Sequence, residues 1–167
     1  MQVTTTAGDI MTSPVITVLP DASVTEIITL LARERISAVP VCAPNGILSG
    51  IVTEGDVLRP IRESVSTRRD WLLGLLAEGE ELPDVFLEYL RRDTRTASDI
   101  MVHHVITADP QATLPGLAEL MTTHGIKRLP IMSDEKLVGI VSRADMVAAL
   151  ARNGNPRPTD NLSMIAN

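Results

Sequence analysis

The sequence predicts an α+β fold built from two related β-α-β-β-α units, with a helical segment inserted between them. The first observation is a repeated phrase, because GIVTEGDVLR (50–59) returns as GIVSRADMVA (139–148). The second is that the repeat extends to DIMTSPVITVLPDASV and DIMVHHVITADPQATL, which begin at Asp9 and Asp99. The third is that short β-branched runs alternate with apolar residues at helical spacing in both copies. Two copies are too few for a solenoid, so we expect two similar halves packed face to face with pseudo-twofold symmetry.

Each unit begins with a predicted strand and an amphipathic helix. The β-branched runs at 15–18 and 105–108 predict strands that end before Pro20 and Pro110. Apolar residues spaced by three or four predict helices over 23–35 and 113–125. Ser23 and Thr113 are the expected N-caps, Glu26 completes a capping box with Ser23, and Gly125 is the expected terminating glycine.

Each unit continues with two strands and a second helix. The runs 37–42 and 127–132 predict short strands interrupted by a proline, and 47–53 and 136–142 predict apolar strands. Helices are expected over 54–61 and 143–151. This order implies a small sheet with both helices on one face, and one such half has little core of its own.

Two segments lie outside the repeats, so we divide the chain into a first repeat (1–59), a helical insert (60–98), a second repeat (99–151) and a polar tail (152–167). The insert contains Trp71, Phe86 and Tyr89, the only aromatic residues. It is either a helical hairpin that covers the main core or a contact in a dimer, since large aromatic side chains anchor interfaces.

Composition excludes several classes of protein. Hydrophobic residues make up 44% of the 167 residues and aromatic residues only 2%, so the core must consist of aliphatic side chains and methionine. A net charge of −6 argues against binding of nucleic acid, although it allows a local basic pocket. With one cysteine, Cys42, no secretory signal and no membrane-length apolar run, we expect a soluble cytoplasmic protein without a membrane partner.

The complete repeat resembles a CBS domain, named for cystathionine β-synthase. The resemblance is carried by VIT, by VP or LP, and by GIVT or GIVS followed by an aspartate, all present twice in register over 9–59 and 98–151. Two such repeats resemble the tandem CBS pair of bacterial type with a helical linker. That family implies regulatory binding of an adenosyl compound in the clefts between the repeats, through AMP, ADP, ATP, S-adenosylmethionine or an NAD derivative. It implies no catalysis, and its modules commonly form dimers.

The resemblance also implies a set of binding residues. The family's Thr/Ser-x-x-Asp pattern, which contacts phosphate and ribose, falls on Thr53 and Asp56 and on Ser142 and Asp145. The early hydroxyls near the ligand are Thr17 and Thr107. The apolar wall for adenine is formed by residues around the proline-containing strands, namely Ile36, Val39, Pro40, Ile126, Leu129 and Pro130.

The same chemistry follows from the residues themselves. One carboxylate can accept hydrogen bonds from both hydroxyls of a ribose diol, and a helix N-terminus attracts phosphate. The alternative is that both Thr/Ser-x-x-Asp patterns are only capping boxes that were duplicated with the fold. The chain is then a structural dimerisation module without a ligand.

The two phrases differ in their surrounding charge. We expect Lys127, Arg128, Arg143 and His124 to surround the second phrase, whereas the corresponding positions of the first are Ser37, Ala38, Glu54 and Glu34. On this basis a nucleotide should prefer the second cleft, since carboxylates repel an anion. No nucleophile–base pattern indicates an enzyme, and His103, His104 and His124 lack the spacing of a metal site. The effector protein that responds to the module is not identified by the sequence.

Overall fold

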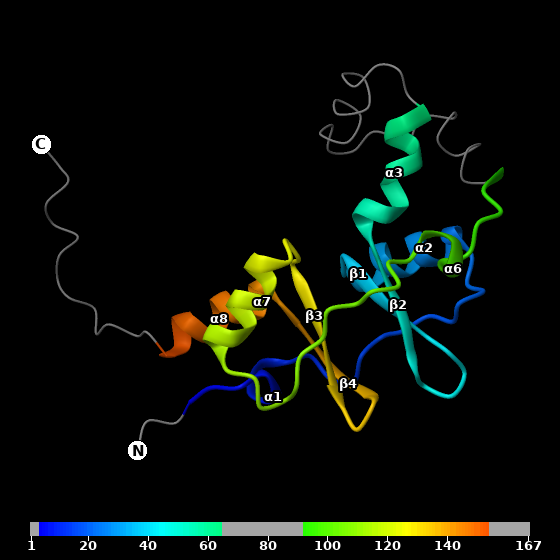
Figure 1. The fold of residues 1–167 in the computed structure, drawn as a ribbon. Helices are drawn as coiled ribbons and strands as arrows, with labels where there is room; N and C mark the ends of the chain where they lie inside the picture. The colour runs from blue at the N-terminus through cyan, green and yellow to red at the C-terminus, as the bar shows by residue number, and fades with distance from the viewer. Residues whose placement is uncertain (1–3, 65–91, 154–167) are drawn as a thin grey trace, which may run out of the picture.

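The computed structural model describes residues 4–64 and 92–153. Trp71, Phe86 and Tyr89, most of the predicted insert, and the tail from 154 onward lie outside the described residues. The described chain is a mixed fold of helices and small antiparallel sheets, which confirms the predicted fold class. The two repeats form two lobes that lie side by side (Figure 1).

The two repeats contain the same elements in the same order (Figure 1). The first repeat has five elements: α1 (Ala7–Ile10), α2 (Val24–Glu34), β1 (Ala38–Cys42), β2 (Leu48–Thr53) and α3 (Glu54–Ser64). The second repeat has the matching five: α6 (Ala97–Ile100), α7 (Leu114–Thr123), β3 (Arg128–Ser133), β4 (Lys136–Ser142) and α8 (Arg143–Asn153). Of these, the short helices α1 and α6 were not predicted.

Each repeat contains one antiparallel hairpin, β1–β2 or β3–β4. Val39 pairs with Val52 and Leu129 pairs with Val141 at equivalent positions. Both hairpins carry an irregularity in the first strand, between Val41 and Cys42 and at the matching place in β3. The equivalence extends to the local distortions, so the backbones of the two halves repeat one another closely.

The strands expected at 15–18 and 105–108 are reduced to single parallel bridges, Val18 with Val41 and Ala108 with Ile131. The backbone N–H of Val18 donates to the carbonyl of Pro40 at 3.1 Å, and Cys42 donates to Val18 at 2.9 Å. Pro40 has no N–H to donate, so the pairing cannot continue from this bridge toward residue 16. The extended segment is therefore held at only two points on the hairpin, which is too few for a full strand.

The helix ends follow the predicted signals. Ser23 caps α2 in a capping box with Glu26, and Thr113 caps α7. Gly125 follows the C-cap of α7 with φ of 64°, a left-handed conformation that glycine adopts without strain.

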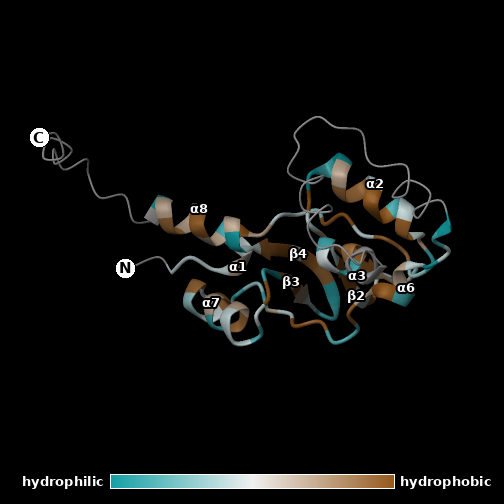
Figure 2. Cartoon of the chain, turned by 90° about the horizontal axis from the view of Figure 1, so that it is seen from above, coloured by the Kyte–Doolittle hydropathy of each residue, from teal (hydrophilic) through white to brown (hydrophobic). Residues whose placement is uncertain are grey.

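The core consists of two clusters, and each contains residues from the N-terminal segment of the other repeat. The second-half cluster contains Leu117, Leu129 and Val141, all fully buried, together with Ala7 and Ile10 from α1 of the first half. The first-half cluster contains Ile27 and Val39 together with Ala97 from α6. Figure 1 shows α1 beside the second hairpin and α6 beside α2, and the central strands β2 and β4 are largely apolar (Figure 2).

The remaining core predictions agree with this arrangement. Met121 and Met146 are buried in the second-half cluster, and Cys42 is buried as a small apolar residue. Burial raises the pKa of the Cys42 thiol, since desolvation disfavours the thiolate. None of the helices among the described residues is both long and apolar enough to span a membrane.

Candidate functional site

A pocket of about 360 Å³ opens between the two repeats. This volume lies in the range of small-molecule sites in proteins. Its lining comes from the end of β2 and the start of α3 on one side and from two segments of the second repeat on the other. The residues that line it are Ser37, Ile51, Thr53, Glu54, Gly55 and Asp56 from the first repeat, and Val102, His104, Val105, Ile106, Gly125, Ile126, Lys127 and Arg128 from the second.

The first-repeat wall is the junction where β2 runs directly into α3. The carboxylate Oδ2 of Asp56 accepts the backbone N–H of Thr53 at 2.9 Å and the Thr53 hydroxyl at 2.7 Å. These bonds hold the carboxylate at the first turn of the helix, as in a capping box. The first turn of α3, with the positive end of the helix dipole, lies at the same edge of the pocket.

The Asp56 side chain is only 7% exposed, although it lines the pocket. Its second oxygen, Oδ1, accepts a hydrogen bond from Arg59 Nη2 at 2.9 Å. The Arg59 side chain is 62% exposed, so this ion pair costs little to open. A buried carboxylate with one oxygen fixed and the other held by a mobile partner can accept a diol donor after a small side-chain movement.

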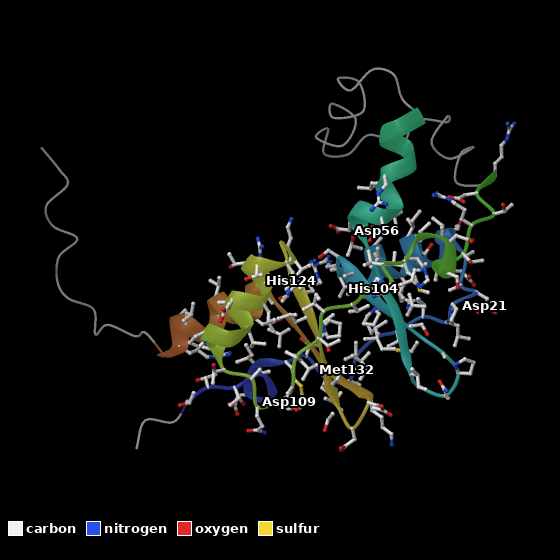
Figure 3. All side chains as sticks on the ribbon, viewed as in Figure 1. Asp21, Asp56, His104, Asp109, His124 and Met132 are labelled. Carbon is white, nitrogen blue, oxygen red and sulfur yellow. The ribbon has the colours of Figure 1, made fainter. Side chains whose placement is uncertain are left out.

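The second-repeat wall is brought to β2 by a reciprocal backbone contact. Ile51 and Val102 exchange two hydrogen bonds, at 3.1 and 2.9 Å. This contact places the segment 102–106 between the hairpins, with His104 on it, and Asp56 lies at the start of α3 nearby (Figure 3). Lys127 and Arg128 complete this wall at the beginning of β3.

The two cations of this wall, Lys127 and Arg128, lie beside both phrases. Lys127 and Arg128 line the pocket that contains Thr53 and Asp56. They also adjoin the second phrase, because Arg128 pairs with Ser142 and the carbonyl of Lys127 accepts the backbone N–H of Arg143 at 3.1 Å. The packing of the second repeat against the first phrase brings them to the pocket of Asp56 as well. Lys127 and Arg128 therefore do not distinguish the two clefts, and the preference for the second cleft stays a prediction.

Five of the predicted binding residues meet in this pocket: Thr53, Asp56, Ile126, Lys127 and Arg128. Val39 and Leu129 are fully buried in the two core clusters, and Pro40 and Pro130 are buried beside them. Ile36 is half-buried against the first-half cluster. Thr17 is exposed and Thr107 is half-buried, and neither lines the pocket.

The second phrase forms the same cap at the start of α8. Oδ2 of Asp145 accepts the backbone N–H of Ser142 at 2.7 Å and the Ser142 hydroxyl at 2.6 Å. Asp145 is half-buried and Arg143 is exposed. Neither these two residues nor Ser142 lines the pocket, so their role as ligand contacts stays a prediction.

Other helices carry the same box at exposed positions outside the pocket between the repeats, and the box of Ser23 and Glu26 lines a separate surface pocket of about 590 Å³. Asp9 bonds to Thr6, Glu26 to Ser23 and Asp99 to Thr96, and all three boxes are exposed. Hydrogen bonds from the backbone N–H and the hydroxyl of the capping residue lower the pKa of each of these carboxyls. Capping alone therefore explains the pattern, and what distinguishes Asp56 is its burial at the pocket edge.

The sequence did not single out several pocket residues, among them His104, Val105, Ile106 and Ile51. These residues reach the pocket through the pairing of Ile51 with Val102, which joins segments of different repeats. The sequence gives one indication that 104–106 could reach a ligand: these residues directly precede Thr107, which the family resemblance places near the ligand. Among the described residues, no group of three or more His, Cys, Asp or Glu side chains is placed to hold a metal ion.

Comparison with known proteins identifies the family. The CBS domain family model matches residues 7–63 and 97–152, which is most of the chain. This chain belongs to the CBS domain family. Its two repeats are a tandem CBS pair, as the sequence resemblance predicted.

The CBS pair has relatives of similar length. An uncharacterised protein of Methanocaldococcus jannaschii, MJ1426, is 36% identical over 153 residues, which cover 85% of this chain and 89% of that protein. The solved CBS domain of a CBS domain-containing membrane protein from Sphaerobacter thermophilus is 34% identical, with a TM-score of 0.66 and 87% of each chain covered.

Two further solved structures share the fold at lower identity. CBSX2, known from Arabidopsis thaliana, was solved in complex with AMP, and is 24% identical with a TM-score of 0.66 over 89% of this chain and 98% of that chain. The CBS domain pair of protein MJ0100 was solved with 5′-methylthioadenosine and S-adenosyl-L-methionine. It is 23% identical with a TM-score of 0.67 over 90% of this chain and 99% of that chain.

Proposed function

We propose that this CBS pair is a regulatory module that binds an adenosyl ligand such as AMP in the pocket between its repeats. The observation that carries the proposal is the buried carboxylate of Asp56 at the edge of a pocket whose opposite wall contains Lys127 and Arg128. The adenosyl ligands of CBSX2 and MJ0100 support the choice of ligand class. ADP, ATP, S-adenosylmethionine and NAD derivatives are further candidates within that class.

Each part of such a ligand has a matching wall. Oδ1 of Asp56 accepts the ribose hydroxyls once Arg59 moves away, while Oδ2 stays fixed by Thr53. Ile51, Ile106 and Ile126 supply an apolar surface for the adenine ring. The first turn of α3 and the cations Lys127 and Arg128 attract phosphate.

Regulation follows from the position of the pocket. A ligand held by Asp56 and Lys127 contacts both repeats at once, so it binds one relative arrangement of the repeats more tightly than another. A ligand shifts a conformational equilibrium only by its difference in affinity for the two states. An effector protein, not yet identified, reads the favoured arrangement.

The test measures ligand binding by calorimetry and by thermal shift with AMP, ADP, ATP, S-adenosylmethionine and NADH. We expect at least one ligand to raise the melting temperature, because a ligand that binds only the native state stabilises it. Asp56→Asn should weaken binding by about 10- to 100-fold, since it removes hydrogen bonds to a charged group. Asp99→Asn is the matched control, because it alters an equivalent cap away from the pocket, and it should leave the affinity unchanged. Equal losses in both variants would contradict the assignment of the site.

The alternative function is a structural dimerisation module with an empty pocket. Two large apolar side chains on one stripe of α8, Val147 and Leu150, are 65% and 57% exposed, which favours an association surface. A homodimer is also compatible with ligand binding, and light scattering tests it. No stabilisation by any of the five ligands, together with a stable dimer, would favour this alternative.

A further inference from the structure

The pocket contains an acidic residue that the proposed binding scheme does not use. Glu54, the first residue of α3, lines the pocket and is exposed. The other charged lining residues have assigned roles, since Asp56 accepts the ribose and Lys127 and Arg128 face the phosphate. Glu54 stands at the N-terminus of the helix, where the dipole favours an anionic ligand and a carboxylate opposes one.

The second repeat has the opposite charge at the same structural position. Arg143 is the first residue of α8, as Glu54 is of α3. The backbone N–H of Glu54 donates to Ser37 at 3.2 Å, and that of Arg143 donates to Lys127 at 3.1 Å. The backbone at this position therefore accepts either side chain, and a cation is compatible with the fold.

The charges along the pocket wall limit the charge of the ligand. Once Arg59 has moved away and Asp56 holds the ribose, the fixed charges of the lining are Asp56 and Glu54 against Lys127 and Arg128. These charges cancel, so the lining has no excess of positive charge. A monophosphate can lie against Lys127 and Arg128, whereas each further phosphate of a di- or triphosphate adds negative charge that no further Lys or Arg of the lining balances.

We infer that Glu54 is a specificity residue that restricts this pocket to adenosyl ligands of low phosphate charge, so that AMP or an uncharged adenosyl compound binds in preference to ATP. The inference rests on the proposed function, because it assumes that the ribose occupies Asp56. It adds a selection among adenosyl ligands by their phosphate charge, which neither the fold nor the Thr-x-x-Asp motif specifies. Glu54 acts through repulsion of the wrong ligand, which is one of the two ways in which binding sites achieve specificity.

The experiment compares wild type, Glu54→Gln and Glu54→Arg by calorimetry with adenosine, AMP, ADP and ATP in the absence of divalent cations. The gain in affinity from Glu54→Gln should increase with ligand charge and be smallest for adenosine. We expect about 3-fold for AMP and about 10-fold for ATP, which are magnitudes typical of one partly solvated charge interaction. Glu54→Arg should extend the same trend and reverse the order of AMP and ATP. Because these interactions are screened, the differences should shrink when ionic strength rises from 50 to about 300 mM.

The control is Glu119→Gln, which removes one negative charge from the exposed surface of α7 outside the pocket. It should leave all four affinities as in wild type. If ATP binds wild type at least as tightly as AMP, or if Glu54→Gln changes all ligands equally, the inference is overturned and the proposed function stands. If no adenosyl ligand binds wild type or either Glu54 variant, the proposed function fails and the inference fails with it.

Discussion

At the scale of single residues, the glycine of the repeated phrase is explained by a contact between the repeats. A Cβ built on Gly139 would overlap the sulfur of Met11 and lie 2.9 Å from its Cβ. A Cβ on Gly50 would overlap Met101 in the same way and lie 3.0 Å from the carbonyl oxygen of Val102. Each methionine follows the short helix of the other repeat. Both copies therefore need a residue without a side chain here, whether or not a ligand binds.

We predict that Gly139→Ala destabilises the protein by about 1–3 kcal/mol, the usual cost of an added methyl group in a packed contact. Flexible methionine atoms can move aside, but the Cβ of Met11 is fixed to the backbone and cannot. Urea denaturation followed by circular dichroism measures the change. Adding Met11→Ala should recover only part of the loss, because it removes the sulfur and Cγ that the new methyl group meets but keeps the Cβ.

The control substitution is Gly116→Ala in the first turn of α7. A Cβ at Gly116 would meet only the Thr113 hydroxyl oxygen, at an ordinary 3.5 Å, and alanine is the better helix former. This variant should be neutral or stabilising. If Gly139→Ala is equally neutral, the contact with Met11 does not explain the glycine.

At the scale of the elements, the equivalent helices α2 and α7 are capped with unequal quality. Ser23 accepts the N–H of Glu26 at 3.2 Å, while Glu26 accepts the N–H of Ser23 at 2.7 Å. Thr113 accepts only a long bond of 3.4 Å from Gly116, and glycine at that position supplies no returning side chain. The start of α2 is thus held by reciprocal bonds and that of α7 by a weak single one.

We predict that Ser23→Ala costs about 1 kcal/mol of stability, in the range of measured N-cap losses, and that Thr113→Ala costs less than half of that. The measurement is the free energy of unfolding of both variants in the same buffer at neutral pH. Because hydrogen bonds from Ser23 lower the pKa of Glu26, the contribution of this cap is present at neutral pH and is lost as the pH falls through the lowered pKa. The difference between the two variants should therefore shrink in acid, and a difference that stays as large there would contradict a role for the Glu26 carboxylate.

The elements also show how far local sequence signals reach. Helix caps, the turn at Gly125 and the strands around Val39 and Leu129 depend on neighbours in sequence, and the sequence predicted them. The strand expected at 15–18 is only a bridge of Val18 with Val41. The β-branched residues of this segment favour a strand, but Pro40 opposite them has no backbone N–H to donate. The pocket wall at His104 depends on the pairing of Ile51 with Val102, a contact between repeats for which the sequence carries no local signal. The same limit explains why the sequence did not also place Lys127 and Arg128 in the pocket of the first phrase.

At the scale of the whole molecule, the two halves are joined by an exchange of their N-terminal segments. Ala7 of the first half is fully buried in the second-half core, where its N–H donates to Ala112 at 2.7 Å. Ala97 of the second half is fully buried in the first-half core, where its N–H donates to Ala22 at 2.8 Å. Neither core is complete without the other half, and the pocket between the halves depends on both.

We predict that the two halves unfold together in a single transition, because the loss of either core exposes a segment of the other. Ile27→Ala in the first-half cluster and Leu117→Ala in the second should each cost about 2–5 kcal/mol, as expected for buried aliphatic side chains. Both should lower the midpoint of the same transition without changing its slope with denaturant, since the slope reports the surface exposed on unfolding. Backbone amide exchange in β1 and β3 provides the decisive readout, and Leu117→Ala should accelerate exchange in β1 as much as in β3. If exchange rose in β3 alone, the halves would be separate folding units, and a ligand bridging Asp56 and Lys127 would hold together two domains instead of biasing the arrangement of one.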